Sequence, residues 1–96
     1  MPVGLVQLEI HLPESGSLKD RRQVVRSLKD QLRHRFNVSV AELDAERDLW
    51  QRATIGIAAI AADHTYLRGL LAQAGEAALR ILAGQQATLG AIEILD

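Results

Sequence analysis

The fold is decided by an alternating stretch near the N-terminus, which reads VGLVQLEIHL from Val3 to Leu12. Every second residue from Gly4 onward is apolar or small, whereas the residues between them mix apolar and polar side chains. This period of two predicts a β-strand with one apolar and one mixed face. The strand is expected to end at Pro13–Gly16, because proline and glycine interrupt regular structure.

A helix is predicted directly after this break, from Leu18 to Arg35. Ser17 is a candidate N-cap, with Asp20 three residues later in a weak version of the capping box. Arg21 and Arg35 fall within the apolar arc, so we expect their stems to cover apolar surface while their charged ends reach water. The apolar side of the predicted helix consists of Leu18, Val25, Leu28 and Leu32.

The next predicted elements are two strands joined by a hairpin connection. Val38–Leu43 forms the first of them, with either Val38 and Val40 or Ala41 and Leu43 buried. The polar stretch Asp44–Asp48 is the connection, and Trp50–Ala61 is the other strand. Gly56, in the middle of that strand, predicts a close approach of another group or a bulge.

A second helix and a last strand complete the chain. Asp63 is the expected cap of a helix from His64 to Leu82, and Gly84 is the expected C′ glycine. Thr88–Leu95 is predicted as one closing strand. The buried side of this helix is predicted to consist of Leu67, Leu70, Leu71, Ala74, Ala78 and Ile81.

This order, β-α-β-β-α-β, predicts an α+β, ferredoxin-like fold for residues 1–96 as one domain. Two helices would cover one face of a four-stranded antiparallel sheet whose first and third strands are central. The other face would be uncovered and too apolar in places for open solvent. We therefore expect a homodimer that uses this face or an edge strand. The uncovered face is predicted to carry Leu5, Gln7, Glu9, His11, Arg52, Thr54, Ala58 and Ile60.

Composition narrows the classes of function. With 48% hydrophobic and 24% charged residues, the 96-residue chain has a globular composition. The formal net charge is −1, so attraction to nucleic acid has to be local. Cysteine is absent, which excludes disulfides, thiolate metal sites and cysteine nucleophiles. Without a basic-then-apolar leader or an apolar run of about 20 residues, a soluble cytoplasmic protein with no membrane partner is predicted.

Basic residues on the first helix are the main candidate binding site. Their spacing of three and four places them in one stripe, roughly 80° wide at about 100° per residue. One interpretation is phosphate contact along an RNA or ribosomal surface, because arginine binds phosphates bidentately. The alternative is an ordinary solvated helix flank. This basic stripe consists of Lys19, Arg22, Arg26, Lys29 and Arg33.

The form of RNA binding is limited by the lack of aromatic residues. The chain has one Phe, one Tyr and one Trp, and the third predicted strand lacks the aromatic motif on which sheet-surface RNA-binding domains stack bases. RNA would therefore be bound through its backbone and shape, with strong salt dependence. No DNA partner is expected.

A partner interface is predicted at Trp50, Arg52, Glu9 and His11. Tryptophan and arginine are enriched at interface hot spots. In the alternative interpretation, Trp50 belongs to the core and Arg52 pairs with Glu9, Glu42 or Asp44.

Glu9 and His11 share a strand face and could serve an acid–base couple or half a metal site. No spacing typical of metal ligands completes them, so a hydrogen-bonded polar pair is the simpler interpretation. No nucleophile with an attendant base is visible. We predict no enzyme activity, no catalytic residue, no metal and no cofactor.

Several segments make the chain resemble the YlxP-like family of small bacterial domains. They are Val3–Leu5, Glu9–Pro13, Ser17–Arg22, Arg35–Glu42 and Asp48–Ala53. The resemblance implies a ferredoxin-like domain of uncharacterised function, whose genes often neighbour those of translation initiation and ribosome maturation factors. The leading hypothesis is a dimeric accessory protein that binds RNA or ribosomal particles. The alternatives are a protein–protein adaptor and a small-ligand-binding dimer that use the open sheet face.

Overall fold

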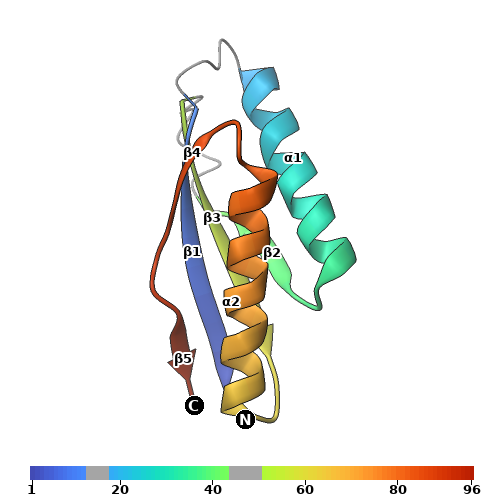
Figure 1. The fold of residues 1–96 in the computed structure, drawn as a ribbon, viewed down its shortest axis with the longest axis vertical. Coiled ribbons are helices and arrows are strands. Elements are labelled where there is room, and N and C mark those ends of the chain that lie inside the picture. The colour runs from blue at the N-terminus through green and yellow to red at the C-terminus, as the bar shows by residue number, and fades with distance from the viewer. Residues whose placement is uncertain (13–17, 44–50) are drawn as a thin grey trace.

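The computed structural model describes residues 1–12, 18–43 and 51–96. Within them, helices α1 and α2 lie against the same face of an antiparallel sheet (Figure 1). This α+β arrangement confirms the predicted ferredoxin-like order. The elements are β1 (Val3–His11), α1 (Leu18–Arg35), β2 (Ser39–Glu42), β3 (Arg52–Ile60), α2 (His64–Ile81), β4 (Gln86–Leu89) and β5 (Glu93–Leu95).

The centre of the sheet is the pairing of β1 with β3. Their register runs without interruption from Val3↔Ile60 to His11↔Arg52. β2 lies beside β3, β4 lies beside β1, and the sheet order is β2-β3-β1-β4. The prediction that the first and third strands are central is therefore confirmed.

The prediction of one closing strand from Thr88 to Leu95 is wrong. β4 pairs with the Leu8–His11 part of β1, whereas β5 pairs with its Val3–Leu5 part. Leu8 pairs with Leu89, and Leu5 pairs with Glu93. These two pairs are three residues apart on β1 but four residues apart on the segment that carries β4 and β5. The extra residue makes a bulge that separates the two strands. At this interruption the Gly90 amide still donates to the Gln7 carbonyl oxygen at 2.8 Å.

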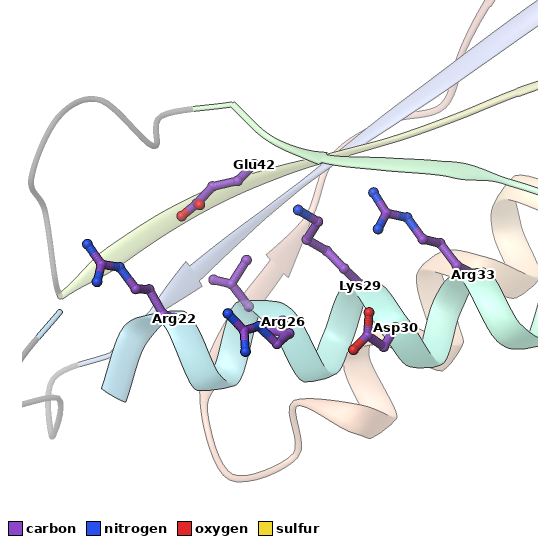
Figure 2. A pocket seen from close by; sticks show the side chains of 7 residues that line it. Arg22, Arg26, Lys29, Asp30, Arg33 and Glu42 are labelled. Atoms are coloured by element: carbon purple, nitrogen blue, oxygen red, sulfur yellow. The ribbon is translucent and has the colours of Figure 1, made fainter. Parts of the chain in front are cut away.

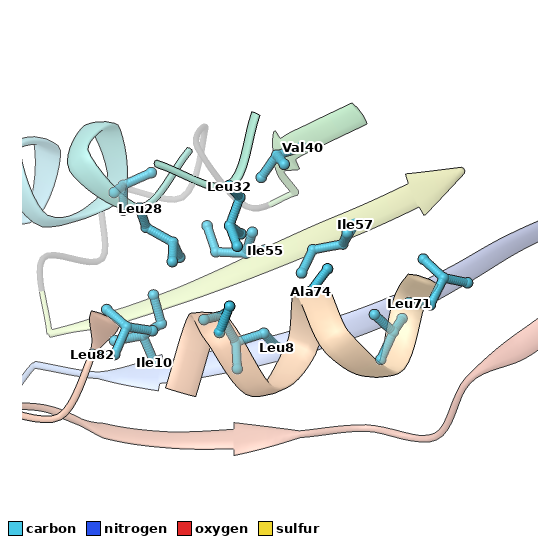
Figure 3. Close-up of a cluster of buried hydrophobic side chains, with 14 of the residues drawn as sticks. Leu8, Ile10, Leu28, Leu32, Val40, Ile55, Ile57, Leu71, Ala74 and Leu82 are labelled. Carbon is cyan, nitrogen blue, oxygen red and sulfur yellow. The ribbon is translucent and has the colours of Figure 1, made fainter. Parts of the chain in front are cut away.

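The core lies between the helices and the inward face of the sheet (Figure 3). Inward side chains alternate along β1 and β3, as the period of two requires. On β2, Val40 is 3% exposed and Ala41 is exposed, which settles the question of which face is buried. The largest fully buried side chains are Leu8, Ile10, Leu12, Leu28, Leu32, Ile55, Ile57, Leu67, Leu71 and Val6.

Two glycines permit close packing of the layers. A Cβ at Gly4 would collide with the side chain of Leu71, so glycine lets α2 approach β1. On the opposite face of the sheet, a Cβ at Gly56 would lie 3.1 Å from Leu43 Cδ1. The close approach predicted at Gly56 is thus made by Leu43, which lies over it and remains 52% exposed.

The ends of α2 follow the prediction in part. The Asp63 carboxylate accepts a hydrogen bond from the Tyr66 amide at 2.7 Å, which confirms the cap. The helix ends at Ile81 with Leu82 as C-cap, so Gly84 lies two residues beyond the cap and is not the C′ glycine. The predictions for Ser17, Pro13–Gly16 and Asp44–Asp48 lie outside the described residues.

No helix within the described ranges combines the length and apolar character needed to cross a membrane.

Truncating Leu28 should destabilise the fold strongly. Its side chain is 0% exposed between α1 and the sheet, so Leu28→Ala is expected to lower the free energy of unfolding by about 2–5 kcal/mol. Urea denaturation followed by circular dichroism measures this change. The control Gln23→Ala, at an exposed position of the same helix, should stay within about 0.5 kcal/mol of the unaltered protein. Equal effects of the two changes would contradict the packing of α1 described here.

Candidate functional site

Most of the basic stripe lies along a groove between α1 and β2, with a volume of about 350 Å³ (Figure 2). Arg22, Lys29 and Arg33 extend from α1 toward β2, and the Glu42 carboxylate extends from β2 toward the helix. Lys19 is exposed on α1, one turn before Arg22, and does not line the groove. The described residues that line this α1–β2 groove are Arg22, Val25, Arg26, Lys29, Asp30, Arg33 and Glu42.

Arg33 has a structural contact in addition to its charge. Its Nη2 donates to the Val40 carbonyl oxygen at 2.7 Å. Because the Leu43 amide donates to Thr54 of β3, the alternation of an antiparallel ladder points the Val40 backbone groups away from β3. Arg33 therefore covers a carbonyl on the outer edge of β2. The stripe cations that line the groove with neither an ion pair nor a side-chain hydrogen bond to another described residue are Arg22, Arg26 and Lys29.

The acidic side chain on the β2 wall is held by a buried arginine. Arg21 Nη2 lies 2.8 Å from Glu42 Oε2, and the side chains are 5% and 19% exposed. Arg21 Nε also donates to the Arg52 carbonyl oxygen at 3.1 Å. A buried guanidinium is tolerated when charge-assisted hydrogen bonds replace its lost hydration. The pair offsets the charge of Glu42, so among the described lining residues Asp30 is the acidic side chain that still opposes the four basic ones.

Sequence reasoning was therefore wrong about Arg21, which does not carry its charge to water. Two features point to the burial of Arg21 with an acidic partner. Arg21 lies on the apolar arc of α1, and Glu42 shares a strand face with the buried Val40. Arg35, the other arginine assigned to that arc, is exposed. Its guanidinium carbon lies 5.3 Å from the centroid of the Phe36 ring, within the range of a cation–π contact.

Three of the four predicted interface residues meet on the open face of the sheet. Glu9 and His11 of β1 and Arg52 of β3 line a depression of about 290 Å³. Each of these side chains is exposed. Trp50, the fourth predicted residue, lies outside the described residues. The depression is also lined by Ile10, Ala53, Thr54, Gln86 and Thr88.

The predicted partners of Arg52 can be compared with this geometry. Glu42 pairs with Arg21 instead, so the pairing of Arg52 with Glu42 is wrong. Among the described residues, the Arg52 guanidinium forms no ion pair with Glu9, and Asp44 lies outside those residues. In the same described part of the chain, no group of three or more His, Asp or Glu side chains is placed to hold a metal ion.

Neutralising Arg21 should destabilise the protein, whereas neutralising its neighbour should not. Arg21→Met leaves the Glu42 carboxylate without its partner, at an expected cost of roughly 2–3 kcal/mol, below the range for fully buried pairs because Glu42 keeps some water. Arg22→Met removes an exposed charge and should change the free energy of unfolding by less than about 0.5 kcal/mol. Urea denaturation of both variants measures the difference. A similar stability of the two variants would contradict a structural role for the Arg21–Glu42 pair.

Fold and groove together define a ferredoxin-like α+β protein with a basic helix–strand groove. Residues 3–89 match the family described as "Protein of unknown function (DUF503)", and the chain belongs to this family. It is 36% identical over 58 residues to the "Uncharacterized protein YlxP" of Bacillus subtilis (strain 168). That match covers 60% of this chain and 62% of the length of the relative. The resemblance to YlxP-like proteins is thereby confirmed.

Solved structures with a similar fold belong to unrelated kinds of protein. A C-terminal segment of the alpha subunit of aIF2 from Pyrococcus abyssi is 22% identical with a TM-score of 0.56, over 91% of this chain and 48% of that one. SnoaB, a cofactor-independent oxygenase from Streptomyces nogalater, is 16% identical with a TM-score of 0.55, over 99% and 91%. An amidase of the hydantoinase/carbamoylase family from Burkholderia multivorans is 13% identical with a TM-score of 0.58, over 99% and 28%. At these identities the likeness shows the fold alone.

Proposed function

We propose that the protein is a small cytoplasmic accessory protein that binds RNA or ribosomal particles through the α1–β2 groove. The observation that carries this proposal is the gathering of Arg22, Arg26, Lys29 and Arg33 in one groove. The acidic residue on the facing wall, Glu42, is already paired with Arg21. A second part of the proposal is that the protein forms a homodimer through its open sheet face.

The charge distribution favours a polyanion as the ligand. With a net charge of −1 the whole chain exerts little attraction, so the groove has to supply it locally. Successive stripe residues are about 5–6 Å apart along the helix surface, which lets one helix contact several phosphates in a row. Three of the four basic groove side chains, Arg22, Arg26 and Arg33, are exposed and form no ion pair with another described residue. Arg33 already donates to the Val40 carbonyl oxygen, which leaves Arg22 and Arg26. These two are the expected primary phosphate ligands.

The described strands favour contact with the RNA backbone rather than base stacking, because they lack aromatic side chains. No Phe, Tyr or Trp occurs among the described residues of β1, β2, β3, β4 and β5. Base-stacking RNA-binding sheets depend on such side chains. The proposed binding is therefore largely independent of sequence and sensitive to salt. Ribosomal particles are the first partner to test, because the resemblance to YlxP-like proteins implies genes near those of translation factors.

Reversing two groove charges should weaken binding strongly without unfolding the protein. The variant is Arg22→Glu together with Arg26→Glu, with Arg33 kept because of its contact with Val40. The measurement is co-sedimentation with ribosomal subunits and total RNA across a salt series. For three phosphate contacts on single strands, the slope of log affinity against log salt should be roughly −2, at about 0.7 per contact.

The matched control places the same charge change on the other helix. Arg68→Glu together with Arg80→Glu alters exposed positions of α2, and this variant should bind as the unaltered protein does. The groove variant should lose affinity by roughly tenfold or more, since each arginine provides charge-assisted contacts. Absence of binding by the unaltered protein at low salt, or equal losses in both variants, would contradict the assignment of the groove.

A further inference from the structure

The open face of the sheet has two chemically different ends. At the end formed by the start of β1 and the finish of β3, Val3, Ile60 and Leu95 are 39%, 57% and 65% exposed. The registers Val3↔Ile60 and Val3↔Leu95 make these three side chains neighbours on adjacent strands. This apolar end continues through the half-buried Leu5 and Ala58, which are directly opposite each other.

The polar end is the depression that contains Glu9, His11 and Arg52. The register pairs Glu9 with Thr54 and His11 with Arg52, so Glu9 and Arg52 are diagonal neighbours on the two central strands. Within residues 1–12, 18–43 and 51–96, neither of these two charged side chains forms an ion pair. Each charge is therefore available to a group that approaches the face from outside.

With the strands aligned and the faces fully overlapping, a two-fold axis could relate two stacked open faces in two ways. An axis across the strands would place the apolar end of one copy over the polar end of the other. That arrangement would bury Glu9 and Arg52 against Val3 and Ile60, at the cost of removing unpaired charges from water. An axis parallel to the strands places the apolar end of one face over the apolar end of the partner's face, and the polar end over the polar end.

The second arrangement matches the chemistry of the face. With the axis between β1 and β3, β1 of each copy lies over β3 of the other. Val3 then lies over the partner's Ile60, and Leu5 lies over the partner's Ala58. Glu9 lies over the partner's Thr54, one diagonal step from the partner's Arg52. Two-fold symmetry repeats each contact, so the apolar contacts and the Glu9–Arg52 attraction both occur twice.

We propose that a second copy of this chain covers the open face, with the two-fold axis along the strands between β1 and β3. This inference rests on the homodimer in the proposed function and specifies its geometry. The partner's Arg52 completes the depression beside Glu9, and the apolar ends cover each other. Face-to-face sheets pack about 10 Å apart with their strands within about 30°, a distance that facing Glu9 and Arg52 side chains can span.

Charge reversal in separate chains tests the arrangement. The variants Glu9→Arg and Arg52→Glu are purified separately and examined by sedimentation equilibrium, alone and mixed in equal amounts. The unaltered protein is expected at twice the 10.5 kDa chain mass. Each variant alone should dimerise at least tenfold more weakly, because like charges would face each other across the axis. The mixture should recover the dimer, since every facing pair then carries opposite charges.

Controls separate this geometry from a general effect of charge or folding. Glu76→Arg and Arg68→Glu make the same charge changes at exposed positions of α2, on the covered side of the sheet, and should leave the dimer intact. Ile60→Lys, at an exposed position of the apolar end, should also yield monomer while keeping the circular dichroism spectrum of the fold. This variant tests the interface even if a charge reversal at Glu9 or Arg52 prevents folding.

The outcomes distinguish this inference from the proposed function. A dimer of the unaltered protein that resists both charge reversals and Ile60→Lys would overturn the arrangement and leave a dimer through another surface. A monomeric unaltered protein at all concentrations would overturn both the arrangement and the proposed dimer. RNA binding by the α1–β2 groove would be unaffected by either result, because the groove charges lie on a different surface.

Discussion

The β1–β3 pairing is the constraint on which the rest of the structure depends. Its continuous register from Val3↔Ile60 to His11↔Arg52 assigns every side chain of the two central strands to one of two faces. A slip of one residue would exchange the faces and expose the core. The same register places the α-helices on one side and gathers Glu9, His11 and Arg52 on the other. Core formation and the candidate interface therefore follow from a single pairing.

A second constraint ties the basic groove to that sheet. Arg21 connects α1 to β2 through the Glu42 carboxylate, and to β3 through the Arg52 carbonyl. Arg33 adds a contact from the other end of the helix to the Val40 carbonyl on the edge of β2. These two arginines hold α1 at both ends of the groove. With α1 held in this way, Arg22, Arg26 and Lys29 line one groove.

The order of elements was predictable because it depends on local periodicity. The period of two in β1 and the helical spacing of Leu28 and Leu32 each reflect one buried face, and a buried face is visible in one segment of sequence. The bulge between β4 and β5 was not predictable in this way. It depends on which part of β1 each strand meets, and residues 88–95 read as one continuous strand when considered alone.

By itself, the sequence determined the β-α-β-β-α-β order, the bounds of α1 and the spacing of the basic stripe, since each of these is set by residues close together in the chain. Only the tertiary structure decided that Arg21 is buried, that Arg33 covers the β2 edge and that four stripe residues line one groove. The physical reason is that an arginine's environment depends on acceptors contributed by distant segments. Glu42 and the Arg52 carbonyl lie 21 and 31 residues from Arg21, and only the folded sheet brings them within hydrogen-bonding distance.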